Sequence, residues 1–158
     1  EANIDAEGGL STDDETLAAL DIVVASPHAA LGQDREVATE RLVRAVEHPS
    51  VDILGHPTGR LITEREGLNP DIERVAAAAA DAGTALEINA DPARLDLRGE
   101  LARVAIDAGA TIVVDTDAHA PDALSYRRYG VHTARRGWCA ASDLLNTRDA
   151  DGLRSFLH

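Results

Sequence analysis

Short apolar runs alternate with helix-like sequence about every 30 residues, and this repeat constrains the fold more than any other feature of the chain. The runs are rich in Val, Ile and Leu, and their length is typical of buried strands. Strands that alternate with helices predict a parallel sheet in an α/β fold. We expect strands at residues 2–4, 22–26, 51–54, 84–88 and 111–115.

The segments between these runs carry helix signals. Apolar residues recur through 35–47 with the spacing of an amphipathic helix. Asn69 and Pro70 are an expected N-cap and first helical residue, and Gly83 and Gly109 are expected C-terminal stops. The pattern predicts helices at 35–47, 70–82 and 97–108, with shorter ones near 121–127, 142–146 and 150–157.

The number of β/α units bears on domain organisation. Five units do not close a barrel, which typically needs about eight. An open five-stranded piece would leave strand edges unpaired. The chain of 158 residues also begins with Glu rather than Met. We therefore expect residues 1–158 to be the C-terminal part of a single domain whose first strands lie upstream.

Residues that can bind metal recur at the predicted strand ends. In parallel β/α folds the C-terminal strand ends meet at one edge, so these residues should converge in space. Histidine and carboxylate ligands together suit Zn, Mn or Fe. A lone strand-end histidine is more often structural, but a series on consecutive strands favours a metal site. The series comprises Glu1, His28, His56, Glu87, Asn89, Asp117 and His119.

Composition limits the environment and the partners. The chain has 28 acidic residues and 15 basic ones, all of them arginine, for a net charge of −13. This balance favours a halophilic source, and a GC-rich mesophile is the alternative. It argues against broad nucleic-acid binding, so any DNA contact should be local, through bound metal and clustered arginines. One cysteine, no signal peptide and no long apolar run predict a cytoplasmic protein that does not bind membranes.

Several segments resemble one known family. The chain resembles the C-terminal portion of a PHP (polymerase and histidinol phosphatase) domain, of the type attached to family X DNA polymerases, and the acidic composition points to a haloarchaeal member. The resemblance runs nearly end to end. It rests on E-A-N-I (1–4), I-V-V-A-S-P-H (22–28), V-D-I-L-G-H-P-T-G-R (51–60), A-L-E-I-N-A-D-P-A-R-L-D-L (85–97), V-V-D-T-D-A-H (113–119) and Y-G-V-H-T-A-R-R-G-W (129–138).

The resemblance implies a distorted (β/α)7 TIM-like barrel that holds up to three divalent ions, Mn²⁺ or Zn²⁺, of which this chain supplies about the last five β/α units. It implies that Glu1 bridges two metals and that His28 and His56 bind the second. Asp117 would bind the first metal and His119 the third, and these five residues would form the catalytic site. The family's earlier ligands have no counterpart here, so we expect the isolated chain to fold poorly and to be inactive.

Other residues are candidates for contacts with a phosphate substrate. Guanidinium groups match phosphate geometry, although a solvated salt bridge is the alternative for each arginine. Glu87 is expected on the strand face opposite to Asn89, as an ion-pair partner rather than a metal ligand. The closing segment that contains Trp138 is expected to pack against the barrel, with base stacking by the indole as the alternative. The candidate substrate contacts are Asn89, Arg60, Arg94, Arg135 and Arg136.

The main functional hypothesis is a metal-dependent phosphoesterase module. The resemblance implies a 3′→5′ exonuclease that processes DNA 3′ ends in repair, with polymerase domains in cis. One alternative is a small-molecule phosphatase of the histidinol phosphatase type. Another is a non-catalytic PHP scaffold, against which the presence of all five expected ligands counts. An amidohydrolase barrel is a fourth possibility, but it would not be expected to carry the early glutamate or the arginine-rich closing segment.

Overall fold

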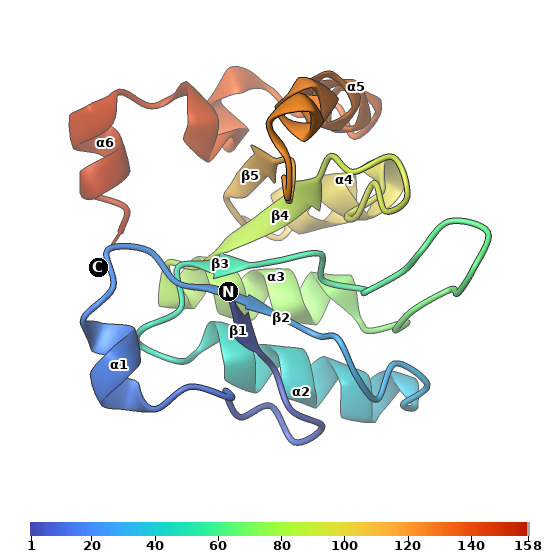
Figure 1. Ribbon diagram of the computed structural model, residues 1–158, viewed down its shortest axis with the longest axis vertical. Coiled ribbons are helices and arrows are strands. Elements are labelled where there is room, and N and C mark those ends of the chain that lie inside the picture. The colour runs from blue at the N-terminus through green and yellow to red at the C-terminus, as the bar shows by residue number, and fades with distance from the viewer. Residues whose placement is uncertain (158) are drawn as a thin grey trace.

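A five-stranded parallel sheet forms the centre of the molecule. The computed structural model describes residues 1–157, and Figure 1 shows its strands side by side. The strand order is β1-β2-β3-β4-β5, so each strand pairs with the next one in the sequence. The predicted α/β class and parallel sheet are confirmed. The strands are β1 (Ala2–Asn3), β2 (Val24–Ser26), β3 (Ile53–Leu54), β4 (Ala85–Asn89) and β5 (Ile112–Asp115).

Three helices connect consecutive strands and lie on one face of the sheet (Figure 1). Right-handed crossovers between neighbouring parallel strands place every connecting helix on the same side. The start predicted at Asn69 and Pro70 is wrong: Asp71 is the N-cap, and its side chain accepts a hydrogen bond from the Arg74 backbone N–H. Gly83 ends the helix in the left-handed conformation, as predicted. These helices are α2 (Arg35–Val46), α3 (Ile72–Ala82) and α4 (Gly99–Asp107).

Alternation along the strands separates two apolar clusters. Leu54, Leu86 and Ile112 face the helices and belong to the main core. Ile53, Ala85 and Val113 are their neighbours in sequence and face the other way, as the period of two requires. The C-terminal segment covers this second face. It contributes Leu145, Leu153 and Phe156.

The longest helix in the C-terminal third, α5 (Arg127–Arg136), was not predicted. Its buried residues are Gly130, Thr133 and Ala134, which are too small to form an apolar stripe. A Cβ atom on Gly130 would lie 2.9 Å from the Ala90 Cβ, so the helix crosses close to the end of β4. Beyond it, the Trp138 side chain is 79% exposed.

Short elements complete the chain. The five-residue helix α1 follows β1, and the described part of the C-terminal third contains three 3-10 helices besides α5 and α6. Within residues 1–157, no helix combines the length and apolar character needed to cross a membrane. The elements are α1 (Asp14–Ala18), η1 (Pro121–Tyr126), η2 (Ala141–Asp143), η3 (Leu145–Thr147) and α6 (Ala150–Arg154).

Candidate metal centre

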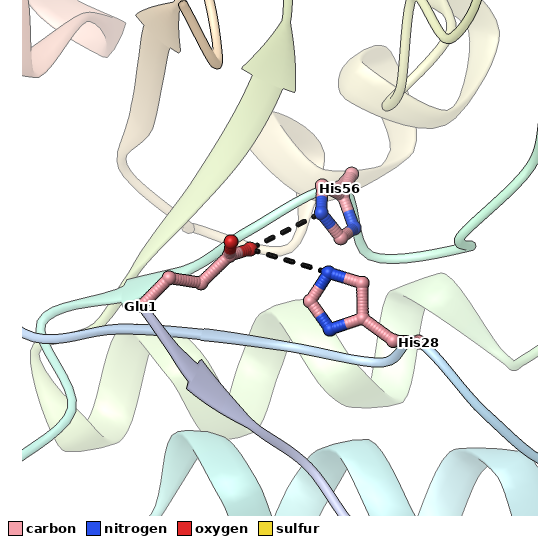
Figure 2. Close-up of side chains that lie close together, drawn as sticks. All are labelled: Glu1, His28 and His56. Carbon is pink, nitrogen blue, oxygen red and sulfur yellow. Dashed lines mark ion pairs between the residues drawn. The ribbon is translucent and has the colours of Figure 1, made fainter. Parts of the chain in front are cut away.

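Three of the predicted ligands meet at one side of the sheet. Glu1 immediately precedes β1, while His28 and His56 each lie two residues beyond β2 and β3. Figure 2 shows both imidazoles turned toward the same Glu1 carboxylate oxygen. The Glu1 Oε1 atom lies 3.2 Å from the His56 Nε2 and 3.6 Å from the His28 Nε2. One candidate ligand atom from each residue lies within 4.8 Å of the others.

Buried carboxylates hold the loop that carries His56. The Glu87 carboxylate accepts a hydrogen bond from the His56 backbone N–H. The Asp96 Oδ2 accepts hydrogen bonds from the Thr58 N–H (3.0 Å), the Thr58 hydroxyl (2.9 Å) and the Gly59 N–H (3.0 Å). These contacts fix a segment in which His56 has a φ of 24°. His56 is thereby presented from a rigid backbone.

Charge and burial prepare the three side chains for a cation. Contact with the His56 imidazole lowers the pKa of Glu1 to about 2, so the carboxylate is ionised. Burial lowers the pKa of His28, which favours the neutral imidazole that binds metals. The His56 side chain is 2% exposed; its Nε2 faces the Glu1 carboxylate, and its Nδ1 has no hydrogen-bond partner within residues 1–157.

A divalent cation fits this arrangement. Unpaired buried nitrogen atoms are costly, so they indicate a missing partner. Carboxylate and imidazole bind Zn²⁺ at about 2.0–2.2 Å, which brings neighbouring ligand atoms within about 4 Å of one another. The separations between Glu1 and the two histidines satisfy that limit. Glu1, His28 and His56 are therefore the residues that could hold the ion.

Asp117 and His119 form a neighbouring group rather than part of this cluster. The Asp117 Oδ2 accepts a hydrogen bond from the Asn89 side chain at 3.3 Å and lies 3.5 Å from the Arg94 Nε. Charges on Arg94 and Asp117 both act on His28, which places the group beside the metal cluster. The His119 side chain is 87% exposed, and its Nδ1 contacts Asp117. Metal binding by Asp117 and His119 stays a prediction.

The predicted arginines occupy three kinds of environment. The Arg94 Nη1 is buried without a hydrogen-bond partner within residues 1–157, so it is available to an anion. The Arg60 guanidinium donates to the carbonyls of Arg94 and Leu95 and thereby ties two loops together. Arg135 and Arg136 are exposed on α5. Substrate contacts by these arginines, and by Asn89, remain predictions.

The structure also adds residues to the site. The Asn3 Oδ1 lies 3.1 Å from the His28 Nδ1, and its position two residues after Glu1 on a strand was the available signal. Glu87 shares a strand face with Asn89, two residues away, so its predicted placement on the opposite face is wrong. Burial, reinforced by Asp115, raises the pKa of Glu87 well above its ordinary value.

Parallel strands, helices on one face and a carboxylate–imidazole cluster define an α/β domain with a candidate metal centre. The chain is 43% identical over 157 residues to the DNA polymerase/3′-5′ exonuclease PolX of Bacillus subtilis. This match covers 99% of the present chain and 28% of PolX. It is 36% identical over 132 residues to a probable phosphatase of Shewanella sp. (strain ANA-3), covering 75% of this chain and 48% of the relative.

A probable phosphatase of Caldanaerobacter subterraneus is 36% identical over 129 residues, with 75% of this chain and 48% of the relative covered. The chain thus spans about half the length of these phosphatases and a smaller share of PolX. No protein-family model matches the chain. The named activities of these relatives, exonuclease and phosphatase, both hydrolyse phosphate esters.

Proposed function

We propose that the chain is part of a PHP-type, metal-dependent phosphoesterase module of a family X DNA polymerase. In this proposal the module removes nucleotides or 3′ blocking groups from DNA ends during repair. The observation that carries it is the cluster of Glu1, His28 and His56, in which the buried His56 Nδ1 has no hydrogen-bond partner within residues 1–157. The similarity to PolX along 99% of the chain supports the choice of DNA as substrate.

The parent domain is proposed to be a (β/α)7 barrel. The five parallel strands in consecutive order agree with an arc of such a barrel. The relatives extend well beyond the matched region, which leaves room for additional strands and for polymerase domains in cis. Further ligands from those strands would complete a set of up to three ions, with Asp117 and His119 contributing from this chain.

The residues of this chain have distinct tasks in the proposed reaction. Glu1, His28 and His56 would hold Mn²⁺ or Zn²⁺. Bound divalent ions supply Lewis acidity and lower the pKa of water to near neutrality. The free Nη1 of Arg94 donates to a phosphate oxygen and stabilises the negative charge that develops there. Asn89 orients the Asp117 carboxylate through its side-chain amide.

A small phosphate monoester is the second candidate substrate. Similarity to probable phosphatases over 75% of the chain favours it. The two candidates differ in what lies beyond the phosphate, because DNA presents a polymer and a monoester does not. Direct comparison of a DNA 3′ end with histidinol phosphate, at equal concentration, separates them.

The first experiment replaces His56 by alanine. The full-length protein that contains this chain is incubated with Mn²⁺ and a 5′-labelled primer on a template, and shortening of the primer is followed on a gel. Removing a ligand should cost more than the 10- to 100-fold typical of outer-shell changes, so we expect loss on the order of 100-fold or more. Bound manganese, measured by elemental analysis, should fall in parallel.

His48→Ala is the matched control, because it removes an imidazole outside the cluster. His48 contacts Asp14 and the Ser50 backbone instead. This variant should retain shortening and manganese at the wild-type level. Equal rates for the wild type and His56→Ala would overturn the proposed site, and a wild type that hydrolyses only the monoester would overturn the DNA assignment.

A further inference from the structure

One face of α5 carries exposed cationic side chains. The residues that face solvent are Arg127, Arg128, Val131, His132, Arg135 and Arg136, which we call the α5 face. Helical periodicity explains the arrangement, because 3.6 residues per turn place Gly130, Thr133 and Ala134 on the opposite, buried side. Arg128 and Arg135 are two turns apart, a rise of about 10 Å.

The charge on this face is not compensated locally. Residues 123–142 contain no aspartate or glutamate, although the chain has a net charge of −13. Arginines elsewhere pair with carboxylates, as in Arg74 with Glu36 and Arg103 with Asp107. Within residues 1–157, the four arginines of the α5 face form no ion pair; Arg127 donates to the Leu124 carbonyl, and Arg128 contacts the hydroxyl and ring of Tyr129. The face is therefore open to a polyanion.

An exposed aromatic side chain follows the helix. Trp138 is 79% exposed and has a φ of 57°, an uncommon conformation for a large residue. An exposed indole does not give the fold the stabilisation that burial of its large apolar area would provide. Nucleic-acid bases offer flat surfaces on which such a side chain can stack, whatever the base sequence. An exposed indole beside unpaired arginines is the pairing that single-stranded nucleic-acid sites use.

The helix that carries the α5 face packs beside the C-terminal end of β4. Gly130 packs against Ala90, the residue that follows β4. Near the other end of α5, a Cβ atom on Gly99, at the start of α4, would lie 2.9 Å from the Arg136 Cβ. The contact with Ala90 is at the C-terminal end of β4, which also presents Asn89. A strand bound along α5 could therefore lead toward Asn89 and Asp117.

We propose that the α5 face and Trp138 bind the single-stranded segment of a DNA substrate near its 3′ end. The choice of DNA rests on the proposed function. A membrane fits less well, because the exposed apolar side chains in this region, Leu124, Val131 and Trp138, do not form a continuous apolar face.

The test measures DNA binding without hydrolysis. In EDTA, a labelled 12-mer of thymidylate is titrated with the protein at several salt concentrations and followed by anisotropy. Each of Arg128→Gln and Arg135→Gln should weaken binding and reduce the slope of log K against log salt by about 0.7. Arg103→Gln removes the same charge from an ion-paired site on α4 and should leave the slope unchanged.

Trp138 provides the second readout. Trp138→Ala should weaken binding on the order of tenfold, whereas Trp138→Phe should retain most of the affinity because a phenyl ring also stacks. Because Trp138 is the sole tryptophan of the chain, DNA should quench fluorescence that Trp138→Phe lacks.

Three results would overturn the α5 site. They are unchanged affinity and salt slope in the arginine variants, equal effects of Arg103→Gln and Arg135→Gln, or binding to phosphatidylserine vesicles in place of DNA. Hydrolysis is measured separately with Mn²⁺. Loss of hydrolysis with retained binding contradicts the proposed function alone, and hydrolysis with binding independent of α5 contradicts only this site.

Discussion

Asp96 is a carboxyl group on which burial and hydrogen bonding act in opposite directions. Three donors in the loop at Thr58 and Gly59 favour its ionised form. Complete burial disfavours ionisation, and the Asp96 Oδ1 has no hydrogen-bond partner within residues 1–157. Burial is the larger effect, so the pKa of Asp96 is raised above 3.8. Folding therefore retains a proton that the unfolded chain releases.

The raised pKa of Asp96 makes the free energy of unfolding depend on pH. Its contribution is present below pH 3.8 and is lost as the pH rises through the folded-state pKa. Urea unfolding from pH 3.5 to 7 should show the wild type losing stability relative to Asp96→Asn. Asp107→Asn is the control with opposite sign, because Arg103 lowers the pKa of Asp107. Parallel pH profiles for wild type and Asp96→Asn would contradict the expectation.

Spacing predicted some site residues better than others. Glu1, His28 and His56 follow a regular strand period, and the structure brings them together. The sequence did not reveal that the Arg60 guanidinium would donate its hydrogen bonds to backbone carbonyls, because such contacts depend on how two loops fold against each other. Asp96 was missed for the same reason, since its donors lie almost 40 residues earlier in the chain.

Among the elements, α5 depends most on small residues. A Cβ atom on Gly130 would approach the Ala90 Cβ to 2.9 Å. Gly130→Ala gains about 1 kcal/mol in helix propensity, but overpacking costs about 1–3 kcal/mol. We expect a net loss of about 1 kcal/mol in the free energy of unfolding, measured in urea. Gly32→Ala, where no atom lies within 4 Å, should be nearly neutral, and equal effects would contradict this packing.

The sequence predicted the strands well but did not predict the helix α5. The apolar run at 111–115 predicts β5 because a buried strand needs apolar residues such as Ile and Val. The α5 segment has Gly, Thr and Ala on its buried face, so no apolar stripe marks it. Its helix forms because small residues allow a close approach to β4 and α4. That reason becomes visible only once the neighbouring elements are in place.

For the whole molecule, the α/β class and the parallel sheet followed from the alternation of strand and helix signals. The charge also acts at this scale. With a net charge of −13, self-repulsion opposes the folded state at low ionic strength. The screening length falls from about 10 Å at 0.1 M salt to about 3 Å at 1 M. The predicted halophilic character is a prediction that salt relieves this self-repulsion.

Salt should therefore stabilise the protein. Raising potassium chloride from 0.1 M to 2 M is expected to increase the melting temperature by several degrees, as followed by circular dichroism. The physical reason is that screened carboxylates repel one another less across the acidic surface. A melting temperature that is unchanged or lower at 2 M would contradict the halophile interpretation.

The position of Glu1 and His56 on separate β/α units has a mechanical consequence. A ligand held by both side chains would close the loop between residues 1 and 56 and tie the first strand to the third. Such a closure restricts the unfolded chain in the way that a covalent cross-link does. The chain has one cysteine and hence no internal disulfide, so an ion at this site would act as its reversible staple.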